Sequence, residues 1–299
     1  MILVFGSINL DLIFDMETLP APGETRLARS MRAEPGGKGA NQAVAAARDG
    51  AEVAFYGAVG RDSFAGPAQA GLESAGVDLW GVEAVAGTTG VASIVTDKVG
   101  RNSIAVAPGA NLGARQDKVP DEFLDEKTIV LVQMECDARE TARLIERASG
   151  AGARVILNLA PSGELPLAIL RMCWLIVVNE QEAEVLAAQA GSAADAASIS
   201  AKLGTGVLRT LGAQGSEACL GGVVHHAAAH RVKAVDTTAA GDCFVGVLAA
   251  GLDRGLDLPA AMRRASVAAA LACTKRGSQG SLPEGAEIDA AMAAEANGG

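Results

Sequence analysis

The sequence predicts an α/β protein in which a doubly wound, mainly parallel sheet is flanked by helices and carries a small β-sheet lid. Short apolar, β-branched segments alternate with Ala-rich segments of helical length, which is typical of chains that build parallel sheets. The apolar segments show no polar alternation, which indicates strands covered by helices on both faces. Two stretches without a helical pattern interrupt this alternation and supply the lid.

The elements of the main layer follow one another along the whole chain. The expected strands are Met1–Ile8, Val53–Ala58, Thr128–Val132, Arg154–Asn158, Leu175–Val178 and Gly206–Leu211. The expected helices are Gly39–Asp49, Phe64–Ala75, Ala138–Ser149, Gln181–Ala190, Ala240–Arg254 and Pro259–Lys275. Because no linker, internal repeat or second core is evident, we expect one domain that spans residues 1–299.

The two interrupting stretches are Leu10–Glu34, which contains PAPGET, and Thr88–Ala107, which has two alternating strands around a DKVGRN turn. Neither stretch has a helix of its own to cover it. We therefore expect segments of about 10–35 and 87–107 to form the lid over the carboxyl edge of the main sheet.

Composition excludes several classes of function. The formal net charge of −10 disfavours binding to nucleic acids or to anionic membranes. The five cysteines are scattered without metal-ligand spacing, which predicts a reduced, cytoplasmic compartment. The opening MILVFGSI lacks a basic region and a cleavage site, so we interpret it as a buried first strand rather than a signal peptide. No apolar segment free of charges is long enough to span a membrane.

The segment VDTTAAGDCFVG, residues 235–246, carries the strongest chemical signal. Ala239, Ala240 and Gly241 place free backbone N–H groups at the start of a helix, where they can stabilise a transferring phosphoryl group. Asp242 follows directly and is a candidate base for an attacking hydroxyl. Taken alone, Asp242 is equally well explained as an acidic residue that stabilises the first turn of a helix.

Three other segments place polar residues where ligands bind in α/β sheets. EPGGKGAN presents Gly37, Lys38 and Asn41 at a loop that opens into a helix, although it lacks the spacing of a P-loop. GSINLD places Asn9 and Asp11 beyond the first strand. VVNEQEAEVL places Asn179 and Glu182 on one helix face, where they can organise hydrated Mg²⁺. In isolation, a turn without a ligand is the favoured explanation of the first two segments, and a helix cap is a frequent explanation of the third.

Together these segments resemble the ribokinase family, also called PfkB-like carbohydrate kinases. The resemblance covers essentially the whole chain in the same order. It rests on GSINLD, PAPGET, PGGKGANQAVAAARDG, GAVGRDSFAG, TTGVAS, QME, NLAPSGELP, NEQEAEVL, TLGAQG, VDTTAAGD and TKRGSQGSLP. It implies an ATP-dependent kinase that phosphorylates the primary hydroxyl of a pentose, with D-ribose as the expected substrate.

The resemblance also implies roles for individual residues. Asp242 matches the base, and the amides of Ala239, Ala240 and Gly241 match the anion hole. The matching sugar contacts are Asn9, Asp11, Gly37, Lys38, Asn41, Ala92, Ile94 and Glu135. The matching nucleotide and Mg²⁺ side comprises Asn179, Glu182, Thr210, Gly212, Gly241 and Ser266. A monovalent cation, usually K⁺, is expected at Asp236, Thr238, Ala272, Lys275, Gly277 and Ser281.

In this family two lids clasp each other, so we expect a homodimer. Two alternatives stay open: a kinase of the same fold for 2-deoxyribose, fructose, ketodeoxygluconate or a nucleoside, and a regulator that binds sugar or nucleotide without catalysis. An intact Asp242 and its anion-binding loop argue against the regulator.

Overall fold

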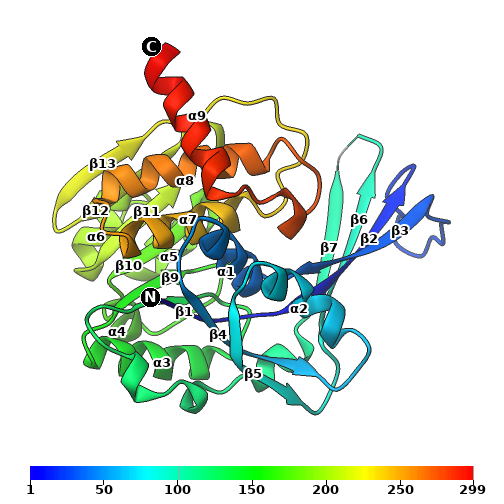
Figure 1. Ribbon diagram of the computed structural model, residues 1–299, viewed down its shortest axis with the longest axis horizontal. Coiled ribbons are helices and arrows are strands. Elements are labelled where there is room, and N and C mark those ends of the chain that lie inside the picture. Colours follow the sequence, from blue (N-terminus) through cyan, green and yellow to red (C-terminus); the bar gives the residue numbers. More distant parts are fainter. Residues whose placement is uncertain (100, 299) are drawn as a thin grey trace.

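The computed structural model describes residues 1–99 and 101–298. Within them, one sheet has the strand order β13-β12-β11-β10-β9-β8-β1-β4-β5 (Figure 1). Its strands are β1 (Ile2–Phe5), β4 (Val53–Gly60), β5 (Asp78–Val85), β8 (Ile129–Val132), β9 (Arg154–Asn158), β10 (Leu175–Asn179), β11 (Gly206–Thr210), β12 (Ser216–Leu220) and β13 (Val223–Ala227). The pairs β11–β12 and β12–β13 are antiparallel, and the others are parallel. The predicted doubly wound, mainly parallel sheet is confirmed.

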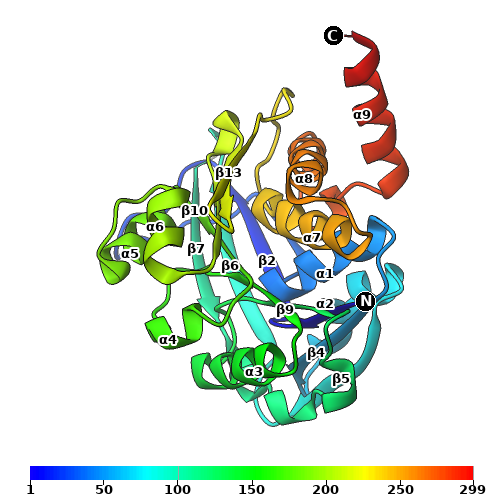
Figure 2. The same cartoon turned by 90° about the vertical axis from the view of Figure 1, so that its left-hand side faces the viewer.

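Helices cover both faces of this sheet (Figure 2). Residues from α1 (Lys38–Arg48), α2 (Ala65–Ser74), α7 (Ala240–Asp253) and α8 (Leu258–Ala272) form one buried core with Ile2 and Val4 of β1. Residues from α3 (Ala138–Gly150), α4 (Leu167–Leu170), α5 (Glu180–Ala190) and α6 (Ala196–Leu203) form the other with Leu3 and Phe5. Successive β1 side chains thus enter opposite cores, which explains the continuous apolar run in the sequence.

The last helix, α9 (Gly285–Gly298), packs against α8. A buried ion pair secures this side of the molecule, since the Arg264 guanidinium of α8 donates to both carboxylate oxygens of Asp49 and to Oδ1 of Asp289 in α9. Within the described residues, no helix is long and apolar enough to cross a membrane.

A separate four-stranded sheet forms the lid, with the order β3-β2-β6-β7. Its strands are β2 (Asn9–Met16), β3 (Ser30–Gly36), β6 (Gly90–Asp97) and β7 (Asn102–Ala107). Leu10 on one face joins the core that contains α2, whereas Asp11 lies on the opposite face beside Ala92. The turn expected at residues 97–102 contains Gly100, which lies outside the described residues.

The expected elements of the main layer are present with shifts of a few residues at their ends, but the first strand is divided. β1 ends at Phe5 and β2 begins at Asn9, so residues 6–8 turn the chain from the main sheet into the lid. Gly6 lies at this corner, where an added Cβ would come within 2.7 Å of Gly39 Cα. The strands β5, β12 and β13 and the helices α4 and α9 were not among the predicted elements.

Candidate active site

The candidate site lies at the carboxyl ends of the parallel strands of the main sheet. β1 and β8 are neighbours there although the chain visits β4 and β5 between them, which makes this the switch point where α/β sheets bind ligands. Polar residues follow or end these strands: Asn9 after β1, Glu135 after β8, Asn158 on β9, Asn179 on β10 and Thr210 on β11.

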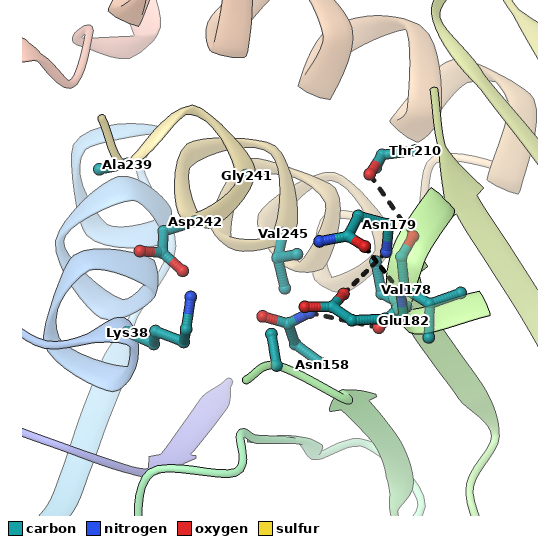
Figure 3. Close-up of a pocket in the computed structure, with 12 residues that line it drawn as sticks. Lys38, Asn158, Val178, Asn179, Glu182, Thr210, Ala239, Gly241, Asp242 and Val245 are labelled. Carbon is teal, nitrogen blue, oxygen red and sulfur yellow. Dashed lines mark hydrogen bonds between the residues drawn. The ribbon is translucent and has the colours of Figure 1, made fainter. Parts of the chain in front are cut away.

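The anion-binding loop begins α7. Ala239, the N-cap residue, has φ of 57° and is the one non-glycine residue with positive φ in the described chain. This turn leaves the N–H groups of Gly241 and Asp242 without an acceptor among the described residues, whereas the Ala240 N–H of the predicted anion hole donates to Thr237 O at 3.3 Å. Ala239 and Gly241 line a pocket together with Lys38, Asn179 and Asp242 (Figure 3). Free amides at a helix start that face a pocket can hold a phosphoryl group.

Asp242 lies in the first turn of α7 and is 8% exposed. Asn41 donates from Nδ2 to Oδ2 of this carboxylate at 3.0 Å, and Gln42 donates from Nε2 to Oδ1 at 3.0 Å. The Lys38 ammonium points toward Asp242 in the pocket (Figure 3), and the carboxylate raises the pKa of Lys38. Asp242 is therefore oriented at the junction of the pocket and the α1 loop, as a base for a bound hydroxyl requires.

The expected sugar residues lie beyond Asp242, around the α1 loop and the lid. The Glu135 carboxylate accepts hydrogen bonds from Ser7 Oγ at 2.5 Å and from the Lys38 N–H at 3.0 Å. Burial raises the pKa of Asp11 to about 7, and the carboxylates of Glu135, Glu34 and Asp242 add to this effect. The structure thus brings Asp11, Lys38, Glu135 and Asp242 into one charged cluster.

Asn9 and the lid residues border the same cluster. The Asn9 amide is oriented by Asn111, whose Nδ2 donates to Asn9 Oδ1 at 2.7 Å while its Oδ1 accepts from the Ile8 N–H. This leaves Asn9 Nδ2 to donate to a ligand. Ala92 is paired with Asp11 across the lid, and Ile94 is paired with Ile13, so both point to the face that carries Asp11.

Close backbone packing explains the glycines of the α1 loop. Gly37 has φ of 93°, and an added Cβ would lie 2.8 Å from Ser7 O. At Gly39 an added Cβ would lie 2.6 Å from Ser7 N. These glycines let α1 begin against the β1–β2 corner, which brings Lys38 and Asn41 to the site.

The expected nucleotide residues are only partly assembled. Asn179 and Glu182 form a capping box, since each side chain accepts a hydrogen bond from the other residue's N–H at 2.8 Å. The cap was the alternative explanation of this pair, yet both residues also line the pocket, as Thr210 does. Gly212 is exposed outside the pocket lining. Ser266 is also outside that lining, and its hydroxyl donates to Ala228 O at 3.0 Å.

The residues expected to bind the monovalent cation lie on two loops that meet in the structure. Asp236 Oδ1 accepts from the N–H and hydroxyl of Thr238, and its Oδ2 accepts from the Gly277 N–H at 3.1 Å. Burial opposes ionisation, but these hydrogen bonds hold the pKa of Asp236 below its usual range. The Lys275 ammonium pairs with Glu287, and the Ser281 hydroxyl donates to Ser278 O. Together with Ala272, these residues have backbone oxygens that can coordinate a cation next to the ionised carboxylate of Asp236.

Sequence reasoning missed four buried polar residues at the site: Gln42, Asn111, Gln133 and Gln279. Their side chains hydrogen-bond to one another or to the expected site residues. Gln42 directly follows Asn41 in the helix start, which was an available signal. The other three come from separate loops and share no spacing that would group them.

Comparisons with known proteins find relatives over nearly the whole chain. The family model described as pfkB family carbohydrate kinase matches residues 1–285. A ribokinase of Haemophilus influenzae is 36% identical, covering 94% of each chain, and a deoxyribokinase of Salmonella typhi is 35% identical, covering 94% of this chain and 95% of its own. The structure of an Arabidopsis thaliana ribokinase complexed with ribose and ATP superposes with a TM-score of 0.87 at 29% identity, covering 97% of this chain and 98% of that one.

Proposed function

We propose, from the premise that the chain belongs to the pfkB family of carbohydrate kinases, that it transfers the γ-phosphate of ATP to the primary 5-hydroxyl of D-ribose. One observation carries the proposal: Asp242 is held between a pocket lined by free helix-start amides and a cluster of polar groups suited to a polyol. The relatives named ribokinase favour ribose within the family.

In this proposal each half of the site has a separate task. Asn9, Asp11, Lys38, Asn41 and Glu135 hold the sugar hydroxyls, and Ala92 and Ile94 of the lid shield the sugar from water. Asp242 takes the proton of the attacking hydroxyl. The amides of Ala239, Ala240 and Gly241 then stabilise charge on the transferring group, because they are fixed before the reaction begins.

The nucleotide would lie along the pocket side, near Asn179, Glu182 and Thr210. Glu182 is buried, which raises its pKa, and its carboxylate with the Asn179 amide would orient hydrated Mg²⁺. Gly212 and Ser266 remain proposed contacts of the base moiety. Asp236, Thr238, Ala272, Lys275, Gly277 and Ser281 would hold K⁺. When bound, these cations supply positive charge that offsets the charge of the phosphates.

The lid supports a homodimer. Ile104 and Val106 of β7 are 55% and 48% exposed. They pair with Ile94 and Ala92, so they extend the apolar part of the face that carries Asp11. A second copy of the chain would cover this face. Five free cysteines, four of them buried, support a reducing, cytoplasmic location.

ADP release tests the function. Wild-type protein should turn over D-ribose faster than 2-deoxyribose, fructose, ketodeoxygluconate or adenosine, measured with and without K⁺. The Salmonella relative makes 2-deoxyribose the second candidate. Binding of ribose without any turnover would instead support the regulator and refute the kinase.

The base is tested by Asp242→Asn, which keeps the shape of the side chain and removes its basicity. We expect kcat to fall by roughly two to four orders of magnitude while ribose still binds. Asp257→Asn is the matched control because Asp257 caps α8 away from the site, and it should retain turnover. Near-normal kcat in Asp242→Asn would refute the assignment of the base.

A further inference from the structure

Three glutamines are buried around the candidate base, and the proposed reaction uses none of them. Gln42, Gln133 and Gln279 are 0%, 1% and 2% exposed. Burying a primary amide is costly when a donor or the acceptor stays unpaired, and the Oε1 atoms of Gln133 and Gln279 have no partner among the described residues. All three amides lead through hydrogen bonds to the carboxylate of Asp242.

The first arm of this network reaches Oδ1 of Asp242. Gln133 Nε2 donates to Gln42 Oε1 at 2.8 Å, and Gln42 Nε2 donates to Asp242 Oδ1 at 3.0 Å. Gln42 Nε2 also donates to Asn158 Oδ1 at 2.9 Å.

The direction of this arm follows from its acceptors. Asn158 Nδ2 donates to the backbone oxygen of Val177, which can only accept, so Asn158 must present its oxygen to Gln42. An ionised Asp242 carboxylate likewise only accepts hydrogen bonds, so Gln42 must donate to it. Gln42 is therefore held with its two N–H groups toward Asn158 and Asp242.

The second arm reaches Oδ2 of Asp242 from the loop that carries the proposed cation residues. Gln279 Nε2 donates to Asn41 Oδ1 at 3.1 Å, and Asn41 Nδ2 donates to Asp242 Oδ2 at 3.0 Å. The Gln279 backbone is fixed in turn, because Arg48 Nη1 donates to Gln279 O at 2.8 Å. Gln279 thus connects the Gly277–Ser281 loop with the base through one intervening amide.

We propose that Gln42 and Gln279 are positioning residues that hold the carboxylate of Asp242 in one plane. The proposal rests on the function of Asp242 as the base. One amide on each oxygen leaves a lone-pair site of each for the sugar hydroxyl. Fixing the plane of the carboxylate orients the remaining lone pairs before substrate binds.

The test replaces each glutamine by methionine, which is of similar length and donates no hydrogen bond. In Gln42→Met and Gln279→Met we expect kcat for ribose to fall about 10- to 100-fold, because the base is no longer held in one orientation. The KM for ribose in Gln42→Met should change less than threefold, because Gln42 does not contact the sugar.

Gln189→Met is the matched control, since Gln189 Nε2 donates to Leu165 O and has no contact with this network. A purely structural role of Gln42 and Gln279 would lower the thermal stability of these two variants and leave kcat unchanged at temperatures where they are folded. If Gln42→Met does not fold, Gln133→Met decides by the same measurements, because it loosens Gln42 without removing its donors.

Two outcomes overturn the proposal. One is an unchanged kcat in folded Gln42→Met and Gln279→Met. The other is that adding Gln42→Met to Asp242→Asn lowers kcat as much as Gln42→Met alone lowers the kcat of the wild-type protein. These outcomes are distinct from failure of the proposed function. That failure is seen as absent turnover in the wild-type protein or as full turnover in Asp242→Asn.

Discussion

Replacing Asp11 by Asn is expected to stabilise the ligand-free protein at alkaline pH and to have little pH-dependent effect in acid. Asp11 ionises at about 7 in the folded chain and near 3.8 in the unfolded chain. Between these values the folded protein keeps a proton that the unfolded chain has released. The free energy of unfolding therefore falls as pH rises through this window, and the deficit is complete above pH 7.

The expected size of the deficit follows from the shift. At about 1.4 kcal/mol per pH unit, a rise from 3.8 to about 7 corresponds to roughly 4 kcal/mol, an upper value because water reaches part of the site. Asn cannot ionise, so the variant lacks this deficit. Its advantage over wild type should rise from near zero at pH 4 to a few kcal/mol at pH 8.

Urea denaturation at half-unit steps from pH 4 to pH 8 measures this difference, because other titrating groups are common to both proteins and cancel. Asp117→Asn is the control, since Asp117 is exposed and makes the same change in charge. A difference between Asp11→Asn and wild type that stays flat with pH would refute the reasoning, as would one that falls as pH rises.

Two further predictions concern the frame of the site. Arg264→Met should lower the free energy of unfolding by about 3–5 kcal/mol in urea denaturation, because it leaves the buried Asp49 carboxylate without its main partner; a loss below about 1 kcal/mol would contradict this. Gly39→Ala should destabilise the protein and raise the KM for sugar, because its Cβ would meet Ser7 N at 2.6 Å. Gly66→Ala, with open space around the new methyl group, should match wild type in both measurements.

The strands of the main sheet could be predicted because their side chains are buried in the hydrophobic cores on both faces of the sheet. β9 was predicted to the residue and the helices to within about three residues, since a strand buried on both faces is a continuous apolar run. The edge strands β5 and β13 were missed because they are exposed and mix apolar with charged or histidine side chains. The Ala-rich α9 has no clear apolar face, so periodicity did not indicate a helix.

The candidate site was predictable where a residue follows a strand or opens a helix, as Asn9 and Asp242 do. Residues that reach Asp242 only through another side chain are not marked by any such sequence pattern. Gln279 lies 238 residues from Asn41 in the sequence, and the 3.1 Å contact between their amides exists only once the lid, α1 and the terminal loop have come together. Gly212 and Ser266 were predicted only from their positions in the family motifs, and neither residue lines the pocket.

Hydrogen-bond donors distinguish two carboxylates that share one acidic cluster. Asp242 receives an amide N–H on each oxygen, whereas no described residue donates to the carboxyl group of Asp11. The carboxyl group without donors holds its proton to about pH 7 until a ligand supplies them. Sugar hydroxyls are such donors, so binding of the sugar should release the proton from Asp11.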